Sequence, residues 1–141
     1  MNVLKVDHIA IAVKNIEQAS KFYQQSLGLK FNGEEIIPEN NVKIAFLKCG
    51  ELDIELLQSL REGEGSIDKF IEENGEGLYH IALEVDDLED SIKILETQNF
   101  KFKSPYPSKG ARNTTIAFLE ESGTNGAVVE LVEGKPFTKS S

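Results

Sequence analysis

The sequence has no tryptophan, and it has only one cysteine and two histidines among its 141 residues. The single cysteine, Cys49, cannot form an internal disulfide, and a lone thiol at a strand end is typical of a small, inert core side chain. The sequence also lacks any apolar run near the roughly 20 residues that span a bilayer, and its N-terminus lacks the basic-then-apolar pattern of a secretion signal. These absences predict a cytoplasmic protein that makes no contact with a membrane.

Positive charge is scarce as well. The chain has 15 Lys and Arg residues against 24 Asp and Glu residues, which gives a net charge of −9. Nucleic acids and anionic membranes are bound by positive surfaces, so neither is expected as a partner. An anionic substrate would therefore be held by a local basic cluster or by a metal ion. The length and the 40% hydrophobic content predict one domain that spans residues 1–141.

The most informative feature is an internal repeat. The segment HIAIAVKNIEQASKF, which begins at His8, recurs 72 residues later as HIALEVDDLEDSIKI, which begins at His80. The tetrapeptide IAFL at 44–47 recurs at 116–119 with the same offset. Each copy then ends in an apolar strand with one glutamate, DIELL around Glu55 and VVELV around Glu130. The chain is therefore interpreted as two copies of one structural unit.

The local patterns predict the order of elements within each copy. Residues 6–13 alternate with period two, which is typical of a strand. Asn15 is a candidate N-cap for a helix that ends near Gly28, and Asp87 and Asn99 repeat these roles in the second copy. Extended segments are expected at residues 30–37, 42–48 and 53–58 in the first copy, and at 100–103, 114–119 and 127–132 in the second.

The predicted fold class is therefore α+β, with two tandem βαβββ modules that form a curved mixed sheet around a metal-binding cleft. The expected boundaries are module one at about 4–60, a linker helix at about 66–74, module two at about 77–133 and a polar tail at 134–141.

The residues expected to bind the metal are His8, Glu55, His80 and Glu130. Both histidines occupy the same position in the repeat, and so do both glutamates. Strand parity places each histidine on the face opposite its apolar neighbours, with a small alanine two residues on, which leaves room for a ligand. A single histidine or glutamate in a strand is compatible with a structural role, but the matched positions favour one joint site. Two imidazoles and two carboxylates suit Co²⁺, Ni²⁺, Zn²⁺ or Mn²⁺, and the choice among them stays open.

These residues and their surroundings resemble the vicinal oxygen chelate superfamily and, within it, the methylmalonyl-CoA epimerase family. The resemblance covers roughly Lys5 to Glu133. It is carried by the segments VDHIAIAV, FYQQSLGL, NVKIAFLKCGELDIELLQSL, SIDKFIEENGEGLYHIALEVDDLEDSI and TNGAVVELVE. The resemblance implies paired βαβββ modules, the four metal ligands named above, and an isomerase that removes the α-proton of a methylmalonyl thioester through a metal-stabilised enolate.

The resemblance also implies roles for individual residues. Glu130 is expected to be catalytic, as a metal ligand that shuttles the proton. Some epimerases carry a second acidic residue at the position of Ile44, so that role has no direct counterpart here. Glu34, Glu35 or Glu39 could replace it, although exposed loop charges are more often simply solvated.

The segment SPYPSKGARN has the proline and glycine content of a mobile loop. Its Lys109 and Arg112 are candidates for binding a substrate carboxylate or phosphate, and ordinary surface charges are an equally good interpretation. Superfamily members are often homodimers, so a homodimer is expected.

Two other functions fit parts of the pattern. Glyoxalase I, a lactoylglutathione lyase that isomerises the hemithioacetal of methylglyoxal and glutathione, uses two histidines and two glutamates in the same order. The chain lacks the D-P-[DN]-G turn that commonly precedes the last glutamate in that family, and it has ESGTNG instead. A metal-free protein that sequesters a small molecule is the third possibility. Such proteins typically lose the ligands and line the groove with aromatic residues, whereas this chain keeps all four ligands.

Overall fold

The computed structural model describes residues 1–139, so the last two residues of the expected polar tail lie outside the described residues. The chain divides into two compact units, His8–Tyr79 and Met1–Asp7 together with His80–Ser141, which are described one after the other. Both contain helices and strands, and each repeat has the order βαβββ, so the predicted fold class is confirmed. The expectation of one domain stays a prediction. No helix within residues 1–139 combines the length and the apolar character needed to cross a membrane.

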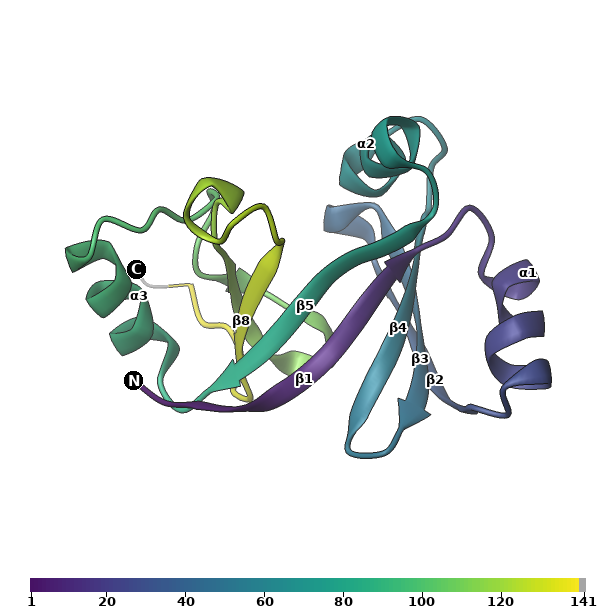
Figure 1. Ribbon diagram of the computed structural model, residues 1–141, viewed down its shortest axis with the longest axis horizontal. Coiled ribbons are helices and arrows are strands. Elements are labelled where there is room, and N and C mark those ends of the chain that lie inside the picture. Colours follow the sequence, from purple (N-terminus) through teal and green to yellow (C-terminus); the bar gives the residue numbers. More distant parts are fainter. Residues whose placement is uncertain (140–141) are drawn as a thin grey trace. The chain divides into compact units, whose positions relative to one another are not determined.

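The first repeat contains four strands and a helix that packs on their sheet (Figure 1). Its elements are β1 (Val3–Ala12), α1 (Ile16–Ser20) continued by the π-helix η1 (Lys21–Ser26), β2 (Lys30–Ile37), the 3-10 turn η2 (Pro38–Asn40), β3 (Val42–Cys49) and β4 (Leu52–Ser59). The strand order is β2-β3-β4-β1. β1 is parallel to β4, and the other neighbours are antiparallel, which makes the sheet mixed. The linker helix α2 (Gly65–Asn74) follows, close to its expected bounds.

The expected helix cap of the first repeat is confirmed. The Asn15 side chain accepts a hydrogen bond from the backbone N–H of Gln18 at 2.8 Å, which satisfies one of the free donors in the first helical turn. The chain leaves the helix at Gly28, whose φ of +78° is adopted most easily by glycine. One face of the sheet packs against this helix, and the buried residues of that core are Ile11, Val13, Ile16, Ala45, Leu47 and Leu56.

The second repeat has the same plan. Its elements are β5 (Gly77–Val85), α3 (Leu88–Thr97), β6 (Ser108–Lys109), the 3-10 turn η3 (Ala111–Asn113), β7 (Thr115–Phe118), the 3-10 turn η4 (Glu121–Gly123) and β8 (Val129–Glu133). The order β6-β7-β8-β5 repeats that of the first copy. Asp87 caps α3 by accepting a hydrogen bond from Asp90 N–H at 3.0 Å, and Asn99 follows the helix with a φ of +70°, so both expectations are confirmed.

The prediction of one strand, at residues 100–103, is wrong. Residues 100–103 form no strand, and only Phe102 makes an isolated bridge, to Leu119. The neighbour of β7 is instead the two-residue strand β6. Pro105 and Pro107 lie between the two segments, and they cannot donate to a strand ladder because proline has no backbone N–H. Phe102 is nevertheless buried, because its ring packs in the core of this unit with Val85, Leu88, Ile92, Ala117, Leu119 and Leu131.

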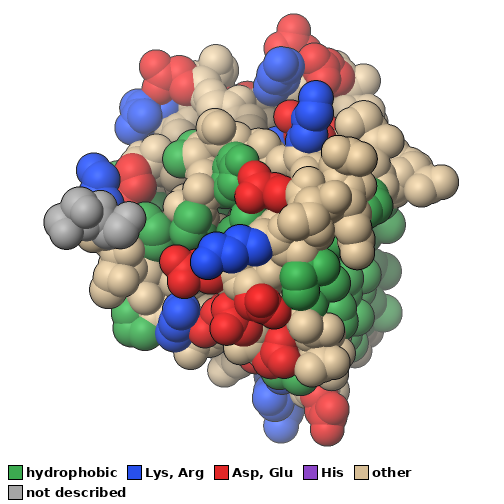
Figure 2. Space-filling view, turned by 90° about the vertical axis from the view of Figure 1, so that its left-hand side faces the viewer, with side chains coloured by type: hydrophobic (Ala, Val, Ile, Leu, Met, Phe, Trp, Pro, Cys, Tyr) green, Lys and Arg blue, Asp and Glu red, His purple; other side chains and the backbone are tan. Residues whose placement is uncertain are grey.

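On the face shown in Figure 2, Lys and Arg side chains lie among Asp and Glu side chains, with hydrophobic side chains between them. Among the oppositely charged residues, Lys103 and Glu121 form an ion pair, and the Lys103 ammonium lowers the pKa of the Glu121 carboxyl. The excess of acidic residues is thus partly compensated locally.

Candidate metal centre

The first histidine and glutamate meet because of the register between two parallel strands. In that register Ala10 of β1 lies beside Glu55 of β4. His8 is two residues before Ala10, so it projects from the same face of the sheet as Glu55. The distance between His8 Nδ1 and Glu55 Oε2 is 3.2 Å, and both residues are 6% exposed. Ala10 is fully buried, and its methyl group leaves room for the two longer side chains.

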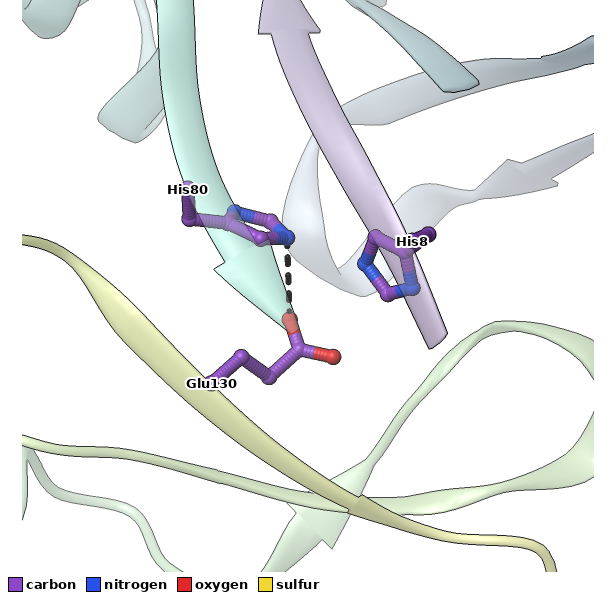
Figure 3. A group of neighbouring side chains, drawn as sticks. All are labelled: His8, His80 and Glu130. Carbon is purple, nitrogen blue, oxygen red and sulfur yellow. Dashed lines mark ion pairs between the residues drawn. The ribbon is translucent and has the colours of Figure 1, made fainter. Parts of the chain in front are cut away.

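The second histidine and glutamate are placed in the same way in the other repeat. Ala82 of β5 lies beside Glu130 of β8, and His80 is two residues before Ala82. The distance between His80 Nε2 and Glu130 Oε2 is 3.1 Å (Figure 3). His80 is 9% exposed and Glu130 is 4% exposed. The two repeats therefore bury the same pair of side chains on equivalent strands.

An aromatic side chain accompanies each pair, and the interpretation of the sequence missed this feature. Phe46 lies beside Glu55 in the register of β3 and β4, and Phe118 lies beside Glu130 in the register of β7 and β8. The rings of Phe118 and His80 meet edge to face, with centroids 5.2 Å apart, which restrains the imidazole. The repeated tetrapeptide IAFL contained the signal, because its phenylalanine is at the same position in both copies.

The donor set fits a divalent metal ion. One ligand atom from each of His8, His80 and Glu130 lies within 4.8 Å of the other two (Figure 3). Buried carboxylates are costly unless a cation compensates them, and neutral imidazole and carboxylate are common ligands of Zn²⁺ and related ions. The three residues can thus hold a metal. Glu55, the fourth expected ligand, contacts His8, and its place in the metal shell stays a prediction.

The two candidate substrate-binding residues lie in the second unit. Lys109 is an exposed residue of β6, and Arg112 is an exposed residue of η3 with a φ of +54°. Their role in binding a substrate stays a prediction.

The duplicated βαβββ order, with a buried His and Glu pair at equivalent positions of each repeat, defines a class of proteins built from two related modules. The sequence of the chain matches the model of the Glyoxalase/Bleomycin resistance protein/Dioxygenase superfamily over residues 7–118. The protein belongs to this superfamily.

Similar proteins include both uncharacterised chains and epimerases. The chain is 37% identical over 131 residues to an uncharacterised protein of Bacillus subtilis, with 93% of each chain covered. It is 35% identical over 130 residues to the ethylmalonyl-CoA/methylmalonyl-CoA epimerase of Cereibacter sphaeroides, with 90% of this chain and 96% of the relative covered. A variant of the Streptomyces coelicolor methylmalonyl-CoA epimerase, solved in complex with 2-nitronate-propionyl-CoA, superposes with a TM-score of 0.87 at 27% identity. That match covers 94% of this chain and 98% of the other.

Proposed function

We propose that the protein is a metal-dependent epimerase of methylmalonyl-CoA or a closely related acyl-CoA thioester. The observation that supports this proposal most is the pair of buried His and Glu contacts, at 3.2 and 3.1 Å, that the two repeats place on equivalent strands. The similarity to epimerases over nearly the whole chain supports the same assignment.

In this proposal His8, Glu55, His80 and Glu130 hold one divalent ion, with Co²⁺, Ni²⁺, Zn²⁺ and Mn²⁺ as the candidates. When bound, the ion would supply positive charge that stabilises the enolate formed when the substrate loses its α-proton. The protein side chains bind the ion and transfer the proton. His8 and His80 would each supply one nitrogen ligand, next to the buried glutamate of the same repeat. Glu130 serves one face of the substrate carbon, where it can remove the α-proton or deliver a proton.

The test uses purified, cobalt-loaded protein in deuterated water with (2S)- and (2R)-methylmalonyl-CoA, and it follows exchange of the α-proton by NMR. Rapid exchange with interconversion of the epimers is expected. In the Glu130→Gln variant the rate of interconversion should fall by about 100-fold or more, because general acid-base groups contribute on that order. Glu89→Gln is the matched control, since it removes a carboxylate from an exposed position of α3 in the same unit. Wild-type protein that leaves both epimers unchanged would contradict the proposal.

Glyoxalase I is the second candidate, because the observed ligand types suit its reaction equally well. The hemithioacetal of methylglyoxal and glutathione is therefore assayed in parallel. Fast consumption of the hemithioacetal without α-proton exchange in the thioester would assign the protein to that reaction. A chain that neither binds metal nor turns over either substrate would instead fit a sequestering protein.

A further inference from the structure

An epimerase needs a second proton-transfer group, because the proton leaves one face of the carbon and arrives on the other. This requirement rests on the proposed function, in which Glu130 serves one face. Ile44, where some epimerases have an acidic residue, is 5% exposed in β3 and cannot transfer a proton. The second proton-transfer group is therefore expected among the acidic residues on the same face of the first sheet.

The strand register places one glutamate directly beside Ile44. Glu35 of β2 pairs with Ile44, and Ile44 pairs with Leu57 of β4. Paired residues on neighbouring strands point to the same face of a sheet. Leu57 is two residues after Glu55, so Glu35 lies on the face that carries Glu55 and His8.

A bulge in β2 is the cause of this placement. Phe31 pairs with Leu47, but the next pair joins Glu34 to Ala45, so β2 has one residue more than β3 over this stretch. Gly33 lies in the bulge with a φ of +102°, a conformation that side chains disfavour. The extra residue reverses the alternation, which turns Glu35 to the ligand face and Glu34 to the opposite one.

The other two candidates are placed elsewhere. Glu34 pairs with Ala45, which packs in the core beneath α1, and its carboxylate lies 3.7 Å from the Lys43 ammonium. Glu39 is an exposed residue of the turn η2. Asp53 shares the ligand face, but it lies beside Lys48 at the far end of β4 and accepts a hydrogen bond from Asn32 Nδ2 at 3.4 Å.

The surroundings of Glu35 suit a small thioester. The neighbouring residues on this face, Ile37, Ile44 and Leu57, are buried and apolar, with exposures of 4 to 5%, so Glu35 has apolar neighbours. Glu35 itself is half-buried. Two strand steps and two residues separate Glu35 from Glu55, which corresponds to a Cα–Cα distance of about 12 Å. This separation leaves room on the face for a small acyl group between Glu35 and the His8 and Glu55 pair.

We infer that Glu35 is the second proton-transfer residue of this protein. Its carboxylate takes the α-proton from one epimer, and the electron pair of the C–H bond stays with the substrate as the enolate. The carboxyl group of Glu130 then gives its proton to the other face. One proton leaves the substrate and one returns, so the two carboxyl groups exchange protonation states. Proton exchange with water then restores the starting states for the next turnover in the same direction.

The test compares Glu35→Gln with Glu34→Gln. The second variant makes the same substitution at the preceding residue, which lies on the opposite face of β2. Both variants should fold and bind cobalt like the wild type, which circular dichroism and metal analysis check. In Glu35→Gln, interconversion of the epimers should fall about 100-fold or more. The epimer whose α-proton faces Glu130 should still exchange that proton with solvent. Glu34→Gln should retain both reactions.

The outcomes separate the inference from the function on which it rests. Interconversion at the wild-type rate in Glu35→Gln would overturn the role of Glu35, but it would still support the proposed epimerase activity. Equal loss of exchange from both epimers would also overturn it, because a proton-transfer group serves only one face. Wild-type protein that exchanges no α-proton would overturn the proposed function and the inference together.

Discussion

Metal binding should stabilise the folded protein, and loss of His80 should abolish that effect. The ligand atoms of His8, His80 and Glu130 lie within 4.8 Å of one another, and all three residues are buried in the folded chain. An unfolded chain does not hold these groups together, so the ion binds the native state preferentially. The free energy of binding then adds to the free energy of unfolding.

The size of the effect follows from mass action. A site with a dissociation constant of about 1 μM, in free metal at about 0.1 mM, stabilises the native state by about 2.7 kcal/mol. For a chain of this length a change of 1 kcal/mol moves the melting temperature by about 3 °C. The melting temperature should therefore rise by about 8 °C when metal is added to the chelator-treated protein.

The assay is differential scanning calorimetry of wild type, His80→Ala and Lys93→Ala, each with and without Co²⁺ or Zn²⁺. The quantity compared is the metal-dependent shift, because truncation of a buried histidine also lowers the baseline stability. His80→Ala should show almost no shift. Lys93→Ala changes an exposed residue of α3 and should keep the full shift. An equal shift in all three proteins would refute the site, because the metal would then bind elsewhere.

Three further changes test the fold. Replacing Asn15 by alanine removes the hydrogen bond to Gln18 N–H and should lower the free energy of unfolding by about 1 kcal/mol in urea titrations, whereas an unchanged midpoint would contradict the capping role. Leu47→Ala empties a fully buried position and should cost about 2 to 5 kcal/mol in the same titrations. The backbone N–H and side chain of Asn2 lower the pKa of Asp86, so this contact stabilises the fold at neutral pH, and the contribution is lost as the pH falls through the lowered pKa. Asn2→Ala should raise the Asp86 pKa in an NMR titration. An unchanged or lowered pKa would contradict the role of the Asn2 side chain.

Much of the geometry of the candidate site could be predicted from the sequence because its determinants are local. The positions of His8 and His80 relative to their alanines follow from the period of a strand, and the repeat shows that each has a partner glutamate. The caps at Asn15 and Asp87 are also local, since each side chain satisfies an N–H three residues along its own chain.

The error at residues 100–103 shows the limit of such patterns. Apolar and basic residues alternate there, as in a strand, but the segment pairs only through Phe102. Burial of the Phe102 ring in a core built from distant residues, and the two prolines that follow, decided its conformation. Neither influence is visible in the alternation itself.

The sequence by itself determined the duplicated elements, their caps and the four residues proposed to bind the metal, because period, capping and repetition depend on neighbours along the chain. Only the tertiary structure decided which glutamate of β2 shares the ligand face. Simple alternation from Phe31 would turn Glu34 to that face, whereas the bulge at Gly33 turns Glu35 to it instead. The physical reason is that the face of a strand residue depends on its pairing with the neighbouring strand, and one extra residue in that pairing reverses every side chain beyond it.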